Sequence, residues 1–178
     1  AGHAGDEGWA AAVALHGRRV LARNVIRGTA GAAYEPGLLA LREGPLLEAA
    51  VRGLGMEFDV LLVNATGLDH PRRAGLALHL GAVLGVPSIG VTHRPLLAEG
   101  AWPEDMPGAA APLTLTGELA GYWLRTRAGK RPLAVHAGWR TTAEVALEVV
   151  RRVAIRARTP EPIRQARKLA RLERAHAG

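Results

Sequence analysis

The sequence predicts a mixed-sheet α/β domain, and three of its features lead to this fold class. Near the N-terminus, two short apolar segments flank a glycine-containing turn, which is the pattern of an antiparallel hairpin. Further along, two apolar segments of strand length are separated by a helix-length segment, which is typical of a parallel βαβ unit. The chain has 178 residues, 48% of them hydrophobic and 22% charged, so it can bury one core and is neither disordered nor collagen-like.

The first elements are a hairpin and a helix. The apolar segments are residues 9–15 and 19–26, and Gly17 between them can adopt positive φ at little cost. Pro45 fits the first turn of a helix, and apolar residues then recur on one face as far as about Leu54.

The βαβ unit comes next. Residues 58–63 (FDVLLV) form a continuous apolar segment, as in a strand buried on both faces. Pro71 can open a helix that ends near Gly85, and residues 86–91 (VPSIGV) predict the second strand. The crossover of such a unit is right-handed, and ligands of such sheets bind beyond the carboxyl ends of the strands. We therefore expect residues 64–67 and 92–94 to lie side by side at the edge of any site.

The C-terminal third completes the α/β pattern. Its predicted elements are a proline-rich surface loop over 93–112, strands over 122–127 and 132–135, and a helix capped by Thr141 or Thr142 that runs to about Arg156. Thr159-Pro160-Glu161-Pro162 breaks that helix, and a basic helix comes after it. We predict one domain over residues 1–158 and a basic C-terminal helix over 159–178 that packs on it or extends from it.

The net charge of +7 is unevenly distributed. Residues 1–150 carry 14 basic and 14 acidic residues, whereas residues 151–178 carry nine basic residues against Glu161 and Glu173. Two interpretations remain open, because a basic tail can bind phosphate backbones and can equally be a solvated helix face.

Several classes of protein are excluded or disfavoured by composition. The chain has no cysteine, which excludes disulfides, thiolate metal sites and a cysteine nucleophile. No apolar run approaches the roughly 20 residues that cross a bilayer, and no leader peptide opens the sequence. We expect a soluble, cytoplasmic protein without a membrane partner.

Four segments resemble, in order, the signature blocks of the endonuclease V family. They are residues 34–43 (YEPGLLALRE), 63–75 (VNATGLDHPRRAG), 86–91 (VPSIGV) and 160–164 (PEPIR). The resemblance implies a ribonuclease H-like fold, a mixed sheet flanked by helices. It also implies a DNA-repair hydrolase that nicks DNA or RNA near a deaminated adenine, inosine, with Mg²⁺ held by carboxylates.

Most of the implied metal ligands are substituted in this chain. The resemblance assigns a catalytic and metal-binding role to Glu43, which keeps its residue type, and places Asn64 where the family has a catalytic aspartate. Ala4 stands at the position of the first aspartate and Trp139 at that of a histidine. One carboxylate and one neutral amide attract Mg²⁺ poorly, because most of the negative charge is gone.

Other residues are candidates for replacement ligands. Asp6, Glu7 and Asp69 lie close in sequence to the substituted positions and can reach Glu43 if the loops bend. His3 and His136 with Glu43 suit zinc or iron better than magnesium, although three scattered residues more often share no site.

The segments implied to contact nucleic acid are better preserved. Tyr34 and Pro36 match the wedge that enters beside the damaged base, where Tyr34 can also be a half-buried loop aromatic. Gly67, His70, Arg72 and Arg73 match the base pocket and its supporting helix, with the alternative that both arginines are salt-bridged surface residues; His93 stands where a lysine is frequent.

These observations support four functional hypotheses. We favour a nucleic-acid-binding pseudoenzyme of the endonuclease V type with little or no nuclease activity. The alternatives are an active Mg²⁺-dependent endonuclease with shifted ligands, a protein-interaction domain, and a repurposed enzyme with a new site around Glu43, His3 and His136. The sequence leaves the oligomeric state and the preference for DNA or RNA open.

Overall fold

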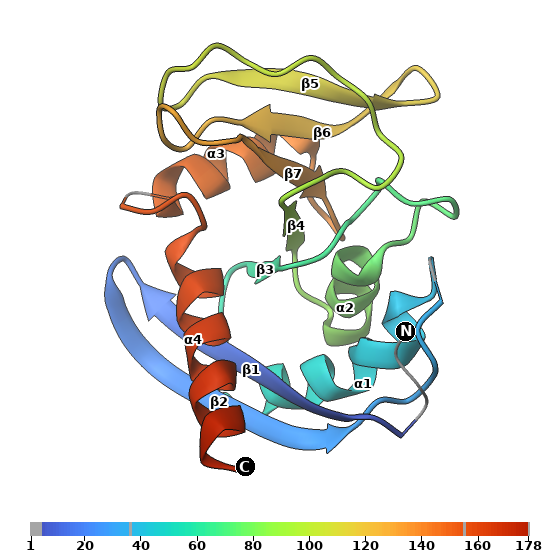
Figure 1. The fold of residues 1–178 in the computed structure, drawn as a ribbon, viewed down its shortest axis with the longest axis vertical. Helices are drawn as coiled ribbons and strands as arrows, with labels where there is room; N and C mark the ends of the chain where they lie inside the picture. The colour runs from blue at the N-terminus through green and yellow to red at the C-terminus, as the bar shows by residue number, and fades with distance from the viewer. Residues whose placement is uncertain (1–4, 36, 155, 178) are drawn as a thin grey trace. The chain divides into compact units, whose positions relative to one another are not determined.

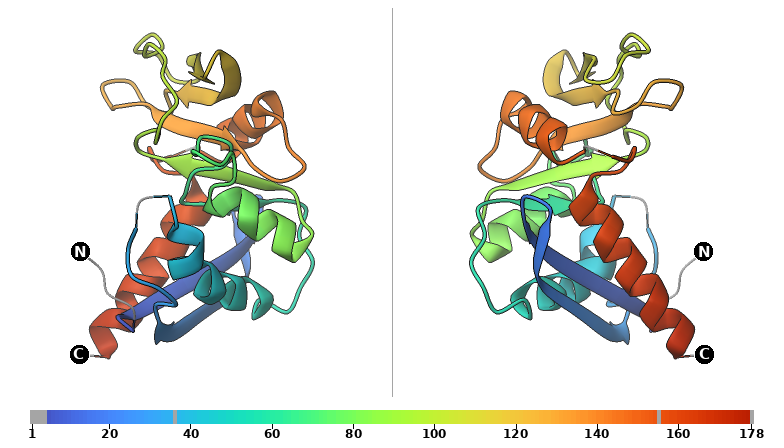
Figure 2. Two further views of the ribbon diagram at one scale, coloured as in Figure 1. Left: turned by 90° about the vertical axis from the view of Figure 1, so that its right-hand side faces the viewer. Right: turned by 90° about the vertical axis from the view of Figure 1, so that its left-hand side faces the viewer.

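The computed structural model describes residues 5–35, 37–154 and 156–177, and these form two compact units. The first unit comprises the chain up to Phe58 together with the chain from Pro162 onward, and the second is Asp59–Glu161. Figures 1 and 2 show the elements of each unit. The predicted boundary between residues 158 and 159 stays a prediction.

The first unit is built on the predicted hairpin. Strands β1 (Glu7–His16) and β2 (Arg19–Thr29) pair in antiparallel fashion around a turn at Gly17, whose φ is 57°. In β1 the alternate residues Ala10, Ala12 and Ala14 are buried, as expected for a strand with one packed face.

Helix α1 (Leu39–Arg52) packs against this hairpin (Figure 2). A Cβ at Gly28 of β2 would lie 2.4 Å from Leu46 Cδ2, so glycine lets the strand approach the helix closely. Asn24 Nδ2 donates a hydrogen bond of 2.9 Å to Ala50 O, which fixes the helix at its C-terminal end.

The predicted start of this helix at Pro45 was wrong. Helix α1 begins six residues earlier, at Leu39, and Pro45 lies inside it. Proline removes the N–H that would bond the carbonyl of Leu41, which normally weakens a helix. Packing against the hairpin outweighs that cost, and Gly31 N–H donates to the neighbouring Arg42 O at 3.2 Å.

Helix α4 (Glu161–His176) is the predicted basic helix and, apart from its first residue, belongs to the first unit. Its Arg174 guanidinium lies 6.0 Å from the centre of the Trp9 ring, and Arg27 of β2 lies 5.5 Å from the same ring. Trp9 therefore takes a cation–π contact from the helix as well as from the neighbouring strand.

The second unit contains a five-stranded mixed sheet of order β3-β4-β7-β6-β5. Its strands are β3 (Leu61–Val63), β4 (Ser88–Thr92), β5 (Ala110–Leu115), β6 (Glu118–Leu124) and β7 (Leu133–Ala137). Strands β3 and β4 are parallel and the other pairs antiparallel, which confirms the predicted βαβ unit with α2 (Leu76–Leu84) between them.

Several boundaries differ from the predictions. Strand β3 has three residues rather than six, and α2 begins five residues after Pro71 because residues 64–75 form an irregular loop. Strand β5 begins at Ala110, inside the predicted 93–112 loop, because alternation resumes before Pro112 at this edge position.

The core of the second unit surrounds β7, in which all five residues are buried. Helix α3 (Ala143–Val153) contacts β6 and β7, and α2 contacts β4 (Figure 1). The predicted cap of α3 is confirmed, since Thr142 Oγ1 accepts a 3.2 Å hydrogen bond from Val145 N–H. None of the helices in the described residues is long and apolar enough to cross a membrane.

Candidate functional site

The loops that follow β3 and β4 are joined by one buried carboxylate. Asp69 has no exposed surface, and its side chain accepts hydrogen bonds from the backbone N–H groups of Leu96, Leu97 and Ala98. The bonds to Leu97 and Ala98 are both 2.7 Å long. Backbone N–H groups compensate a buried negative charge, so Asp69 fixes the second loop against the first. The two loops are therefore joined, through residues that follow the predicted segments 64–67 and 92–94.

His136 of β7 lies beside this carboxylate. Thr92 Oγ1 donates to Arg94 O at 2.6 Å, so it must accept the 2.8 Å hydrogen bond from His136 Nε2–H. In the neutral imidazole the proton then resides on Nε2, and Nδ1 carries a lone pair. Nδ1 lies 3.8 Å from Asp69 Oδ2 and has no hydrogen-bond partner in the described part of the chain.

Burial favours the neutral imidazole. It lowers the pKa of His136 from its ordinary value of 6.5 to about 4, and the negative charge of Asp69 opposes this shift. The site at neutral pH therefore contains an uncharged histidine that positions Thr92 at the end of β4.

Gly67 is required by the packing of this loop. A Cβ at Gly67 would lie 2.0 Å from the carbonyl oxygen of Ala137, and Leu68 N–H donates to the same oxygen at 2.9 Å. The loop after β3 thus lies directly on the end of β7. This contact alone accounts for a glycine here, whatever role the residue has toward a base.

The two residues implied to be catalytic belong to different units. Asn64 is exposed and follows the last residue of β3 directly, in the second unit. Glu43 is exposed on α1 of the first unit. Partial desolvation raises the pKa of the Glu43 carboxyl, and the neighbouring Arg42 guanidinium opposes the shift.

The replacement carboxylates have other partners. Asp6 pairs with Arg42 at 3.0 Å, and Glu7 pairs with Arg27 at 2.6 Å. Both oxygens of Asp69 are engaged by the 96–98 backbone, so the expectation that it can bend toward a metal was wrong: a buried, fully bonded carboxylate cannot turn outward without breaking three hydrogen bonds.

The hypothesis of a zinc or iron site around Glu43, His3 and His136 stays a prediction, because His3, like Ala4, lies outside the described residues. Glu43 and His136 belong to separate units. In residues 5–35, 37–154 and 156–177 no group of three histidine, aspartate or glutamate side chains is placed to hold a metal ion. In the loop after β3, the neutral amide of Asn64 and the engaged carboxylate of Asp69 do not fit Mg²⁺, which prefers several free oxygen ligands.

The residues implied to contact nucleic acid are mostly on the surface. Tyr34 is 54% exposed, which fits both the wedge and the half-buried loop aromatic, so both interpretations stay predictions. Pro36 lies outside the described residues. His93 follows β4 and is exposed. His70 is buried, and its Nδ1 accepts a 3.2 Å hydrogen bond from Arg72 N–H, which gives it a structural contact within the loop.

Arg72 and Arg73 lie in a turn rather than at a helix start, because α2 begins at Leu76. Arg73 has a positive φ of 54°, and its guanidinium forms an ion pair with Glu118 of β6. Its charge is thus partly neutralised, in line with the salt-bridged alternative. Arg72 is exposed.

Sequence reasoning missed the organising role of the Asp69–His136 pair. It treated both residues as candidate metal ligands and neither as a link between loops. The available signal was His136 itself, a single polar side chain within the apolar segment 132–137, since a buried histidine needs a hydrogen-bond partner.

Fold and site define a mixed α/β protein in which the loops after two parallel strands meet at one edge of the sheet. A profile of the Endonuclease V family matches residues 2–168. The endonuclease V of Methanopyrus kandleri is 45% identical over 169 residues, which cover 94% of this chain and 73% of that protein. The chain belongs to the endonuclease V family.

Solved structures agree with this assignment. The endonuclease V of Streptomyces avermitilis superposes with a TM-score of 0.84 at 30% identity, over 99% of this chain and 85% of that one. The endonuclease V of Ciona intestinalis, solved with a 24mer DNA containing an inosine, has a TM-score of 0.80 at 21% identity, over 97% of this chain and 86% of that one. The ribonuclease H-like α/β fold implied by the sequence is confirmed.

Proposed function

We propose that this chain binds DNA or RNA containing deaminated adenine and has little or no Mg²⁺-dependent nuclease activity. Family membership supports the nucleic-acid ligand, and an inosine-containing DNA is the ligand in the Ciona intestinalis structure. The family resemblance also implies Mg²⁺, so the proposal separates binding from cleavage.

The observation that carries the proposal is the state of the carboxylates near the strand ends. Asn64 offers a neutral amide oxygen after β3, and Asp69 in the same loop is buried with both oxygens engaged. A divalent cation gains most of its binding energy from charged, accessible oxygen ligands. This loop provides none of them.

Binding depends on different groups and can persist. Tyr34 is exposed and has the flat apolar face that a wedge beside an unstacked base needs. The exposed Arg72 and His93 lie on loops that Asp69 holds in a fixed arrangement, since the 96–98 backbone is bonded to it. Preorganised loops lower the entropic cost of binding.

The test measures cleavage and binding on the same oligonucleotides. Inosine-containing and unmodified DNA and RNA are incubated with the full chain in Mg²⁺ or Mn²⁺, and binding is followed by fluorescence anisotropy. We expect binding that favours inosine and no metal-dependent nick. Robust nicking that Glu43→Ala abolishes would establish an active endonuclease instead, and absence of binding to every oligonucleotide would refute the nucleic-acid ligand.

A further inference from the structure

Two segments of the second unit are entirely basic in their charged residues. Residues 125–131 (RTRAGKR) connect β6 to β7, and residues 151–158 (RRVAIRAR) include the end of α3 and the first residues after that helix. Together they contain eight cationic side chains and no carboxylate. The basic tail seen in the sequence is therefore divided, and its first part belongs with the β6–β7 turn rather than with α4.

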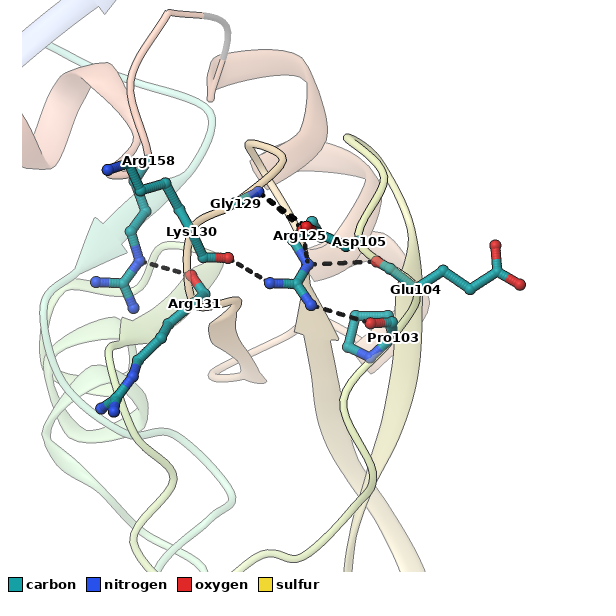
Figure 3. A network of polar contacts seen from close by, with 8 residues as sticks. All are labelled: Pro103, Glu104, Asp105, Arg125, Gly129, Lys130, Arg131 and Arg158. Carbon is teal, nitrogen blue, oxygen red and sulfur yellow. Dashed lines mark hydrogen bonds and ion pairs between the residues drawn. The ribbon is translucent and has the colours of Figure 1, made fainter.

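Hydrogen bonds hold the two segments together. Arg127 Nη1 donates to Arg156 O at 2.7 Å, and Arg158 Nε donates to Arg131 O at the same distance. Arg158 Nη2 also donates to Pro132 O at 3.1 Å. Figure 3 shows the Arg158 guanidinium beside the backbone of Arg131, with the Arg131 side chain directed away from it.

Two of the eight cationic side chains pair with carboxylates, Arg125 with Asp105 and Arg152 with Glu148. Arg125 is buried, lies 3.3 Å from Asp105 and donates to the backbone carbonyls of Pro103 and Glu104. The arginine cluster, defined as Arg127, Arg131, Arg156 and Arg158, forms no ion pair in the described part of the chain. In Figure 3, Glu104 points away from Arg125 and from Arg158.

Like charges in the cluster repel one another. Partial burial lowers the pKa of the Arg158 guanidinium, and the positive charge of Arg131 lowers it further. Arg127 and Arg158 are fixed in spite of this repulsion, because each donates to a neutral backbone carbonyl. Their positive charges and their other N–H groups remain available to an anion. A polyanion would relieve the repulsion.

We propose that the arginine cluster binds the phosphate backbone of the nucleic acid, as an interface on the β6–β7 turn beside the far end of the loop after β4, whose residues 103–105 are bonded to that turn. Guanidinium groups match phosphate oxygens in pairs, and those fixed in advance lose less entropy on binding. The inference rests on the proposed function, because that function makes nucleic acid the polyanion that this chain meets. Such contacts raise affinity for any sequence and do not select the base.

The test removes the two charges whose side chains do not link the segments. Arg131 and Arg156 are exposed, and they take part in these links only through their backbone carbonyls. The variant Arg131→Gln/Arg156→Gln therefore leaves the links between the segments intact. The matched control is Arg18→Gln/Arg19→Gln, which removes two exposed charges at the β1–β2 turn.

Affinity for inosine-containing and unmodified single-stranded DNA is measured by fluorescence anisotropy over a range of salt concentrations. We expect the cluster variant to bind both about ten-fold more weakly, and to lose roughly 1 to 2 from the slope of log K against log salt. The control should keep both the affinity and the slope to within about two-fold.

The outcomes separate the two proposals. If the unmodified chain binds DNA and the cluster variant binds it equally well, the arginine cluster is not an interface, while the proposed function stands. If the unmodified chain binds no oligonucleotide but binds vesicles of phosphatidylcholine and phosphatidylserine, the polyanion is a lipid surface and both proposals are refuted. An equal loss of affinity in the control variant would mean that binding depends on the net charge of the chain alone. That result would also refute the arginine cluster as an interface.

Discussion

Asp69 Oδ2 lies 3.8 Å from His136 Nδ1, and neither side chain has exposed surface. The carboxylate accepts hydrogen bonds from three backbone N–H groups, and the imidazole donates a hydrogen bond from Nε2–H to Thr92 Oγ1. The two groups are thus neighbours that each rely on other partners. Together they connect the loop after β3, the loop after β4 and the middle strand β7.

Replacing Asp69 by alanine should destabilise this connection strongly. Asp69→Ala leaves three backbone donors without their acceptor and removes a buried carboxylate that the loop is built around, so we expect a loss of about 3 to 5 kcal/mol in the free energy of unfolding. Urea denaturation measures it, and hydrogen exchange at Leu96–Ala98 should accelerate. Asp59→Ala, at an exposed aspartate, should change stability by less than about 0.5 kcal/mol.

Stability should fall as the pH decreases below 6.5. Burial lowers the pKa of His136 from 6.5 to about 4. Between pH 6.5 and pH 4 the unfolded chain therefore binds a proton that the folded chain does not. The stability is complete above pH 6.5 and is lost toward pH 4, by up to about 3 kcal/mol. Urea denaturation at pH 7 and pH 5 measures the loss, which should shrink in His136→Asn. An equal pH dependence in that variant would assign the effect to other groups.

Adding one methyl group at Gly67 should be costly. In Gly67→Ala the new Cβ would lie 2.0 Å from Ala137 O, so the loop must move off β7, at a cost of at least about 2 kcal/mol. Gly8→Ala is the control, because its Cβ would meet Leu46 Cδ1 at an ordinary 3.7 Å. Thermal unfolding compares the two; similar melting temperatures would contradict the close contact.

Removing the partner of Arg73 should strengthen nucleic-acid binding. Glu118 pairs with Arg73 and is 72% exposed, so Glu118→Gln removes a negative charge and releases the guanidinium. We expect a two- to five-fold gain, roughly what one added phosphate contact provides at low salt. Anisotropy titrations with single-stranded DNA measure it. In Glu118→Gln/Arg73→Gln the gain in affinity should disappear. A gain that persists in this double variant would show that Arg73 is not its cause.

Restoring carboxylates should restore metal affinity. The variant Ala4→Asp/Asn64→Asp returns the two family residue types, so we expect tighter Mn²⁺ binding by at least about ten-fold in isothermal titration. Ala101→Asp, at an exposed loop position, tests for a general effect of added charge. Equal Mn²⁺ affinity in all three proteins would show that these positions do not form the metal site.

The fold was accessible from the sequence where local patterns and packing agree. Residues 9–26 pair as predicted, and Thr142 caps α3, because alternation, turn chemistry and capping act over a few residues. The helix at Pro45 was misplaced because a proline that favours a helix start is tolerated inside α1 by tertiary contacts. The family resemblance supplied the arrangement of the sheet.

The site was harder to predict, since its interactions link residues distant in sequence. No local pattern indicates that Asp69 is fully buried or that it binds the backbone 27 to 29 positions further on. The division of the basic tail between two units was equally hidden, because it depends on where Arg127 and Arg158 find carbonyl acceptors. Residue identity alone did indicate the charge deficit at Asn64.

The way Asp69 holds the loop after β4 leaves that loop open to sequence variation. The Asp69 carboxylate accepts hydrogen bonds from backbone N–H groups, so it imposes no requirement on the side chains of Leu96 and Leu97, each of which is 45% exposed. Substitutions there can accumulate without loss of the local backbone path. The side chains at this edge of the protein can therefore change during evolution while the scaffold beneath them stays unchanged.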